Sequence, residues 1–145
     1  MNIFQTTYDQ RLQNWYELRS KIKNSDVKTI CVEVDKWWQK APLVNHYLHE
    51  DCQDIWPGPW ELLCENTYCN MARGLGMIYT LCLLGIKEVE FHKAKDYNNE
   101  DVVLVLVDSA KYILNYWPDT VLNNSLQDFT ILKRIELSNI LEKIK

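Results

Sequence analysis

The stretch that decides the fold is WPGPWELLCENTYCNMARGLGMIYTLCLLGI, which runs from Trp56 to Ile86. Its second half, Tyr68 to Leu84, is apolar on nearly all sides, a pattern typical of a helix buried within a protein. Thr67 is a suitable N-cap for this helix, and Gly85 is a suitable residue to end it. Cys69 is therefore expected in the first turn of a buried helix, where the partial positive charge of the helix end favours a thiolate.

Two amphipathic helices are predicted before this stretch. Residues Tyr8 to Lys23 and residues 26 to about 39 each place apolar side chains on one stripe at helical spacing. Asp26 can cap the second helix. Prolines and aromatic residues between Ala41 and Trp60 predict an ordered connection, and Pro59 suits the first turn of a short helix.

The hydrophobic period changes after the central helix. KEVEFHKA (residues 87–94) alternates, which predicts a half-exposed strand with His92 on its solvent side. The β-branched run from Val102 to Val107 predicts a buried strand. After a tight turn, Tyr112 to Trp117 predicts a third strand.

The end of the chain is predicted to be helical. Ser125 and Asp128 resemble a capping box that opens a helix extending to about Ile144. Helices followed by a three-stranded antiparallel meander and a C-terminal helix define an α+β fold. The length suits one domain covering residues 1–145.

Charge and composition exclude several classes of function. The net charge is −4 and the Lys and Arg residues are scattered, which argues against nucleic acid or an anionic membrane as a partner. The longest apolar helical stretch, residues 77–86, is too short to span a bilayer. Five cysteines without a CxxC pair favour free thiols in a reducing cytoplasm.

No metal or cofactor is expected. His46 and His49 are spaced to share a helix face, but a zinc site needs three or four ligands, and no second cluster follows at a suitable spacing. Loop histidines are the simpler interpretation of this pair.

Cys69 is open to two interpretations, a nucleophile or a packed core thiol. A cysteine nucleophile needs a histidine to move protons and a third group to orient that histidine. The layout of Cys69, the small residue Ala72 and the Gly85–Ile86 pair that begins a strand resembles the transglutaminase-like branch of the papain-like cysteine enzymes. The resemblance covers about residues 68–119.

The same resemblance implies where the other catalytic residues should lie. The family's histidine begins the second strand, where this chain has Val102 and Val103, and its acid falls near Tyr116. A catalytic set would therefore require Cys69 as nucleophile, His92 as a substitute base and Asp119 as the acid. The alternative is a fold that has lost the reaction.

A longer set of motifs extends from Tyr8 to about Asp119. In chain order the motifs are RLxxWxxLR (residues 11–19), WWxxAP (37–42), WPxPWELL (56–63) and YCxxARxLG (68–76). They resemble small proteins encoded by contractile-tailed bacteriophages, especially those that infect marine bacteria. This resemblance implies a virion component of the tail, baseplate or neck, assembled in the host cytoplasm, and it transfers no catalytic residues.

The phage resemblance also implies the partners, which would be other phage structural proteins, with the chain present in several copies. Six Trp and eight Tyr must be buried or placed at an interface. Rigid Trp-Pro corners favour protein contacts, and the alternative is that they fill the core. The candidate interaction residues are Trp37, Trp38, Trp56, Trp60 and Trp117. A factor that binds a host enzyme is a third hypothesis.

Arg73 lies within the apolar central helix. A buried guanidinium requires a carboxylate or several carbonyl acceptors. A structural ion pair is therefore expected, with Glu61, Glu65 or Asp119 as the partner.

Overall fold

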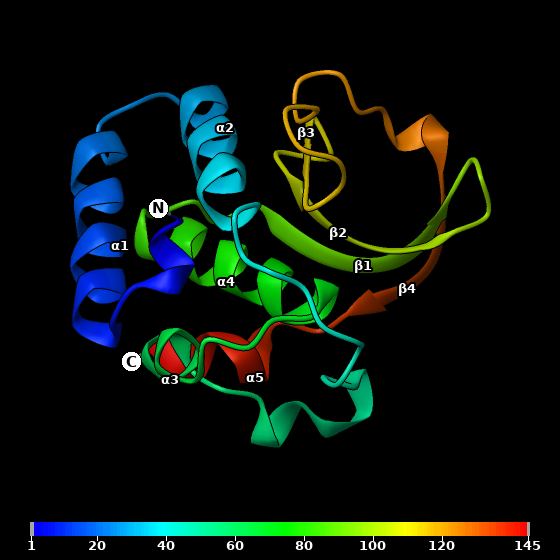
Figure 1. Ribbon diagram of the computed structural model, residues 1–145. Coiled ribbons are helices and arrows are strands. Elements are labelled where there is room, and N and C mark those ends of the chain that lie inside the picture. Colours follow the sequence, from blue (N-terminus) through cyan, green and yellow to red (C-terminus); the bar gives the residue numbers. More distant parts are fainter. Residues whose placement is uncertain (1, 145) are drawn as a thin grey trace.

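The computed structural model describes residues 2–144, and its central element is helix α4 (Asn70–Leu83). Helices α1 (Tyr8–Ile22) and α2 (Val27–Trp38) stand beside one end of α4, and α3 (Pro59–Glu65) lies below it (Figure 1). The sheet packs against another side of α4, through contacts with β1 and β2. Helix α4 is thus surrounded by other elements, as its all-round apolar sequence predicts.

One antiparallel sheet of four strands forms in the described residues, in the order β3-β2-β1-β4. The strands are β1 (Val89–Asp96), β2 (Asp101–Val107), β3 (Tyr112–Leu114) and β4 (Phe129–Ile135). The first three form a meander along the chain, and β4 returns to the opposite edge beside β1. The described residues end in α5 (Ser138–Leu141) and a 3-10 turn, η4 (Glu142–Ile144).

The two faces of the sheet contribute to two apolar clusters. Phe91 and Val105 point toward α4 and belong to the main core, which also contains the buried faces of the helices. The opposite face carries a smaller cluster, against which Tyr116 and Phe129 pack. Because strand side chains alternate between faces, β1 and β2 contribute to both clusters, so both of their faces are buried. The α+β class predicted from the sequence is confirmed.

The predicted N-terminal helices are confirmed, and their caps account for their boundaries. Thr7 and Gln10 form a reciprocal capping box at the start of α1. Asp26 accepts a hydrogen bond from the Thr29 backbone N–H at 2.8 Å and so begins α2. Each bond satisfies an N–H that the first helical turn leaves without a partner.

The predicted helix from Ser125 to about Ile144 is wrong over its first part, and only residues 138–144 are helical. Ser125 caps only a single 3-10 turn, η3 (Leu126–Asp128), and the next seven residues form strand β4. Thr130 and Ile131 are β-branched, which favours a strand, and β1 offers a free edge for pairing. Ile131 pairs with Ala94 and Lys133 with Lys93, so Leu132 is the extra residue of a bulge.

Two predicted boundaries also change, and a third is confirmed. Cys69, not Thr67, is the N-cap residue of α4, with an extended backbone (φ −104°, ψ 178°). The third strand ends at Leu114 rather than Trp117, because Asn115 adopts a left-handed conformation (φ 70°) that stops the ladder. Gly85 follows α4 with φ 86°, in agreement with its predicted role in ending the helix.

Candidate functional site

Cys69 lies at the head of α4 and is completely buried. Its side chain makes no capping hydrogen bond to the helix. Tyr47 lies near Cys69. Burial, and to a smaller extent the nearby Cys69, raises the pKa of Tyr47 to about 12. A substrate carbonyl cannot reach the sulfur without a rearrangement of the surrounding core.

His92 faces away from α4. Its neighbour Phe91 points at α4, where a Cβ added to Gly74 would come within 2.7 Å of the Phe91 ring. Successive strand residues point to opposite faces, so the imidazole of His92 lies on the far side of the sheet from Cys69. There its Nε2 hydrogen-bonds Glu90 Oε1 at 3.0 Å.

The predicted solvent exposure of His92 is wrong. The side chain is buried because β1 is an inner strand, with β2 on one side and β4 on the other. Asp119 is exposed and lines a separate hollow beside α2 with Val32 and Asp35. The structure therefore does not bring Cys69, His92 and Asp119 together.

A pocket of about 380 Å³ opens at the head of α4. Asn70 and Arg73 contribute from the helix, and Val102 and Val103 from the start of β2. Residues 115–118 form the wall after β3. The resemblance to the cysteine enzymes places a histidine at position 102 or 103. Both positions are valines that line the pocket.

A second hollow of about 370 Å³ adjoins this pocket and shares Asn70, Val102 and Val103 with it. It is also lined by His46, whose ring stands 4.9 Å from that of His49 between centroids. Within residues 2–144, no three His, Cys, Asp or Glu side chains gather closely enough to hold a metal ion.

Arg73 is held by Asn115, so the predicted ion pair with Glu61, Glu65 or Asp119 is wrong. The Arg73 Nε donates to Asn115 Oδ1 at 2.6 Å. The Asn115 amide nitrogen donates to the carbonyl oxygens of Asn70 and Val103, at 2.9 and 2.8 Å. One asparagine thus joins the head of α4, the start of β2 and the guanidinium.

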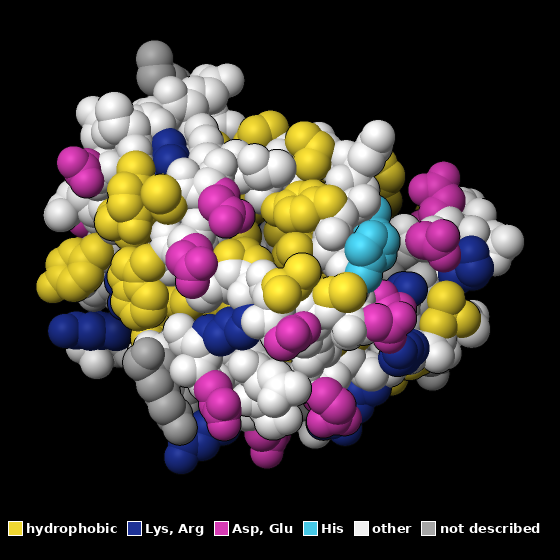
Figure 2. Space-filling view, turned by 90° about the horizontal axis from the view of Figure 1, so that it is seen from below, with side chains coloured by type: hydrophobic (Ala, Val, Ile, Leu, Met, Phe, Trp, Pro, Cys, Tyr) yellow, Lys and Arg dark blue, Asp and Glu magenta, His cyan; other side chains and the backbone are white. Residues whose placement is uncertain are grey.

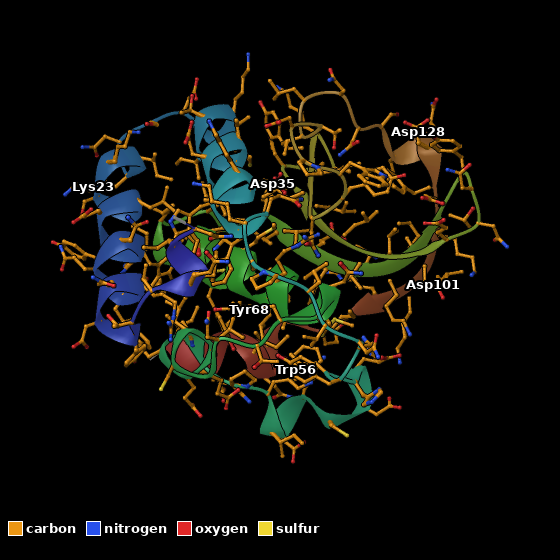
Figure 3. The ribbon with its side chains drawn as sticks, in the orientation of Figure 1. Lys23, Asp35, Trp56, Tyr68, Asp101 and Asp128 are labelled. Carbon is orange, nitrogen blue, oxygen red and sulfur yellow. The ribbon has the colours of Figure 1, made fainter. Side chains whose placement is uncertain are left out.

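Asp35 extends this network from α2 (Figure 3). Its Oδ1 accepts from the Asn115 backbone N–H at 2.9 Å and from Gln39 Nε2 at 3.3 Å. Burial raises the pKa of Asp35 above its usual range, although these hydrogen bonds and Arg73 oppose the rise. Burial also lowers the pKa of Arg73, so each ion is held in a site with little water.

The five candidate interaction tryptophans divide into two groups. Trp37, Trp38 and Trp56 are buried, with indole N–H groups donating to Asn14, Thr80 and the His49 carbonyl. Trp60 and Trp117 are 44% and 63% exposed. The first three therefore fill the core, and an interaction role is open only to the last two.

The face that carries α3 is seen from below in Figure 2. Hydrophobic side chains occur there in several patches, and acidic and basic side chains lie between them (Figure 2). Trp60 and Ile55 are among the exposed apolar residues of α3 and the 3-10 segment η2 (Glu50–Ile55). None of the helices in residues 2–144 is long and apolar enough to cross a membrane.

No protein-family model matches the chain, and no curated protein matches it significantly. Sequence reasoning missed Asp35 and Asn115, which hold the pocket together. The only local signal at Asn115 is the residue type, because asparagine tolerates the left-handed backbone better than other non-glycine residues.

Proposed function

We propose that this chain is a bacteriophage structural protein, a virion component of the tail, baseplate or neck, that binds other phage proteins and performs no acyl transfer. The observation that carries the non-catalytic part is the separation of Cys69 from His92 by the sheet. A completely buried thiol whose candidate base, His92, lies on the far face of the sheet lacks the proton acceptor that acyl chemistry requires.

The phage part of the proposal rests on the sequence motifs, and their distribution in the fold supports it. The motifs cover residues 11–19, 37–42, 56–63 and 68–76. They supply most of α3, much of α1 and α4, and the corner after α2. Most of their aromatic residues are buried, among them Trp15, Trp38 and Trp56, whereas Tyr16 and Trp60 are exposed. The shared motifs are therefore the ones that build the core around α4, as expected for a family defined by a common fold.

The partners we propose are other phage structural proteins, with the chain present in several copies in a particle. Trp60 and Trp117 are large aromatic side chains that remain exposed, and tryptophan is enriched among the residues that dominate protein interfaces. The net charge of −4 supports protein partners over nucleic acid.

Mass spectrometry of purified phage particles tests this proposal. The chain should be present in stoichiometric amount after the particles are washed at high salt. Its presence in infected cells but absence from washed particles would contradict the proposal and favour a factor that binds a host enzyme.

A cysteine-dependent acyl-transfer enzyme is the second candidate function, because the pocket lies at the head of the helix that Cys69 caps. Time-resolved labelling of the folded protein with iodoacetamide separates the two. Exposed Cys52 and Cys64 should label first. Buried Cys31, whose pKa burial raises to about 12, and buried Cys69 should label last. Faster labelling of Cys69 than of the exposed thiols would support the enzyme instead.

A further inference from the structure

The pocket at the head of α4 contains a buried cation with unused hydrogen-bond donors. Arg73 is only 7% exposed, and its Nε is occupied by Asn115. Its two terminal nitrogens make no hydrogen bond or ion pair within residues 2–144. Asp35 is connected to Arg73 only through Asn115. Neither nitrogen is among the fully enclosed polar atoms that lack a partner within residues 2–144, so both are reached from the pocket. Their fork geometry matches a carboxylate that binds through both oxygens.

The helix head adds a second attraction for an anion at the same place. Helix α4 has fourteen residues, and its N-cap side chain makes no hydrogen bond to the first turn. The N–H groups of that turn and the helix dipole favour negative charge beside Asn70, which also lines the pocket. Both features point to a carboxylate at the base of the pocket.

Another part of the pocket wall has the reverse charge. Asp96, Glu100 and Asp101 line it. The hydrogen bond from the Glu100 N–H is the largest effect that holds the pKa of Asp96 below its usual range. Asp96 is therefore ionised at neutral pH. Asp101 is paired with Lys95 at 2.8 Å. Glu100 makes no ion pair within residues 2–144, so Asp96 and Glu100 supply the uncompensated negative charge.

Trp117 completes the rim. It is 63% exposed and lines the same pocket. An indole face attracts a cation, and it also covers the hydrocarbon part of a ligand. A simple anion would be attracted by Arg73 but repelled by the acidic wall. A ligand with charges of both signs satisfies both walls.

We propose that this pocket binds a zwitterionic ligand, a carboxylate and an ammonium or guanidinium on one short stem. The carboxylate pairs with Arg73 at the head of α4, and the cation lies between Glu100 and Trp117. The volume of about 380 Å³ suits a ligand of this size. The ligand is either a free small molecule or neighbouring acidic and basic side chains of a partner protein. This inference concerns the pocket itself and does not depend on a place in a phage particle.

Three probes of equal stem length test the charge requirement: 6-aminohexanoate, hexanoate and hexylamine. Each is titrated into the folded protein, with ¹H–¹⁵N NMR shifts of the Trp117 indole and Asn115 side-chain amide as the readout. We expect 6-aminohexanoate to bind at least tenfold more tightly than either singly charged probe. Equal binding of hexanoate and 6-aminohexanoate, or no shift at either residue, would overturn the proposal.

Substitutions in the pocket test which residues bind each end of the ligand. Glu100→Gln should weaken 6-aminohexanoate about tenfold and leave hexanoate unchanged or tighter, and Trp117→Ala should weaken 6-aminohexanoate severalfold. The matched controls Glu17→Gln and Trp60→Ala alter exposed residues that do not line this pocket, and they should change nothing. Equal effects of control and pocket variants would contradict the assignment.

Two variants, Arg73→Lys and Arg73→Met, test whether Arg73 binds the carboxylate of the ligand. Both should weaken hexanoate and 6-aminohexanoate at least tenfold while leaving hexylamine unchanged. If neither variant folds by circular dichroism, the Glu100 and Trp117 variants still decide the proposal. A blocked dipeptide, acetyl-Glu-Lys-amide, distinguishes the sources. If the dipeptide binds more tightly than 6-aminohexanoate, the natural ligand is a protein partner. If the dipeptide binds more weakly, the natural ligand is a small molecule.

Discussion

Gly76 lies directly against the indole ring of Trp38: a Cβ at position 76 would come within 2.5 Å of the ring. The ring cannot retreat, because it packs edge-on against Trp37 and Tyr68 and its N–H is bonded to Thr80. The contact explains why α4 tolerates a glycine in its middle. The close neighbour is a side chain.

Gly76→Ala should therefore destabilise the fold although alanine favours helices. The propensity gain of about 1 kcal/mol opposes an overpacking cost of typically about 1–3 kcal/mol, and here the obstacle is a rigid, fully buried ring. We expect a net loss in the free energy of unfolding, measured by urea denaturation. Ser20→Ala on the exposed surface of α1 is the control, with a change within about 0.5 kcal/mol. A stabilised Gly76→Ala would show that Trp38 can move.

Thr80 holds two indoles at once, and removing its hydroxyl should be costly. Its Oγ1 accepts from Trp15 Nε1 at 2.9 Å and Trp38 Nε1 at 3.0 Å, and it donates to the Gly76 carbonyl at 2.7 Å. Thr80→Val keeps the shape but leaves two buried N–H groups without acceptors. At about 1–3 kcal/mol for each such group, the variant should lose at least about 2 kcal/mol of unfolding free energy.

Thr80→Ser is the matched control for that variant, because it retains the hydroxyl and removes only a methyl group. It should retain most of the stability, and both variants can be measured by chemical denaturation with Trp fluorescence as the signal. Equal losses in Thr80→Val and Thr80→Ser would assign the effect to packing rather than to the hydrogen bonds.

Asn115→Asp should destabilise the protein even though it sets a carboxylate beside Arg73. The side-chain amide donates to two carbonyl oxygens, those of Asn70 and Val103. A carboxylate there would lose both bonds and face two acceptors, a cost of about 2 kcal/mol or more. The loss should shrink on acidification, because the introduced carboxyl group can donate again once it is protonated; thermal unfolding at pH 4 and pH 7 measures this. Greater stability at pH 7 than the wild type would mean that the ion pair outweighs the lost donors.

Asp35 should make the folded state less stable as pH rises. Burial raises its folded-state pKa above 3.8, the ordinary value, so the folded state holds the proton more tightly than the unfolded chain does. Between pH 3.8 and the raised pKa, the unfolding free energy therefore falls with increasing pH. Asp35→Asn removes this titration. The difference in unfolding free energy, wild type minus Asp35→Asn, should decrease through that window, and a difference that increases would be inconsistent with a raised pKa.

The sequence predicted the parts of the fold that are encoded locally. The helical stripes of α1 and α2, the Asp26 cap, the alternation of β1 and the β-branched run of β2 each depend on residues within a few positions of one another. Strand β4 was not predictable in this way. Its seven residues fit both a helical stripe and a strand, and the choice depends on the free edge of β1, more than thirty residues earlier in the chain.

The candidate site shows the same division. Cys69 at the head of a buried helix followed from the sequence, because hydrophobic period and helix boundaries are local properties. Tertiary structure alone decided three further features. Cys69 is sealed in the core, His92 faces the other side of the sheet, and Arg73 binds Asn115 across 42 positions. Burial and hydrogen-bond partners depend on how distant segments pack, and no spacing along the chain specifies which of several acids or amides will meet a buried charge.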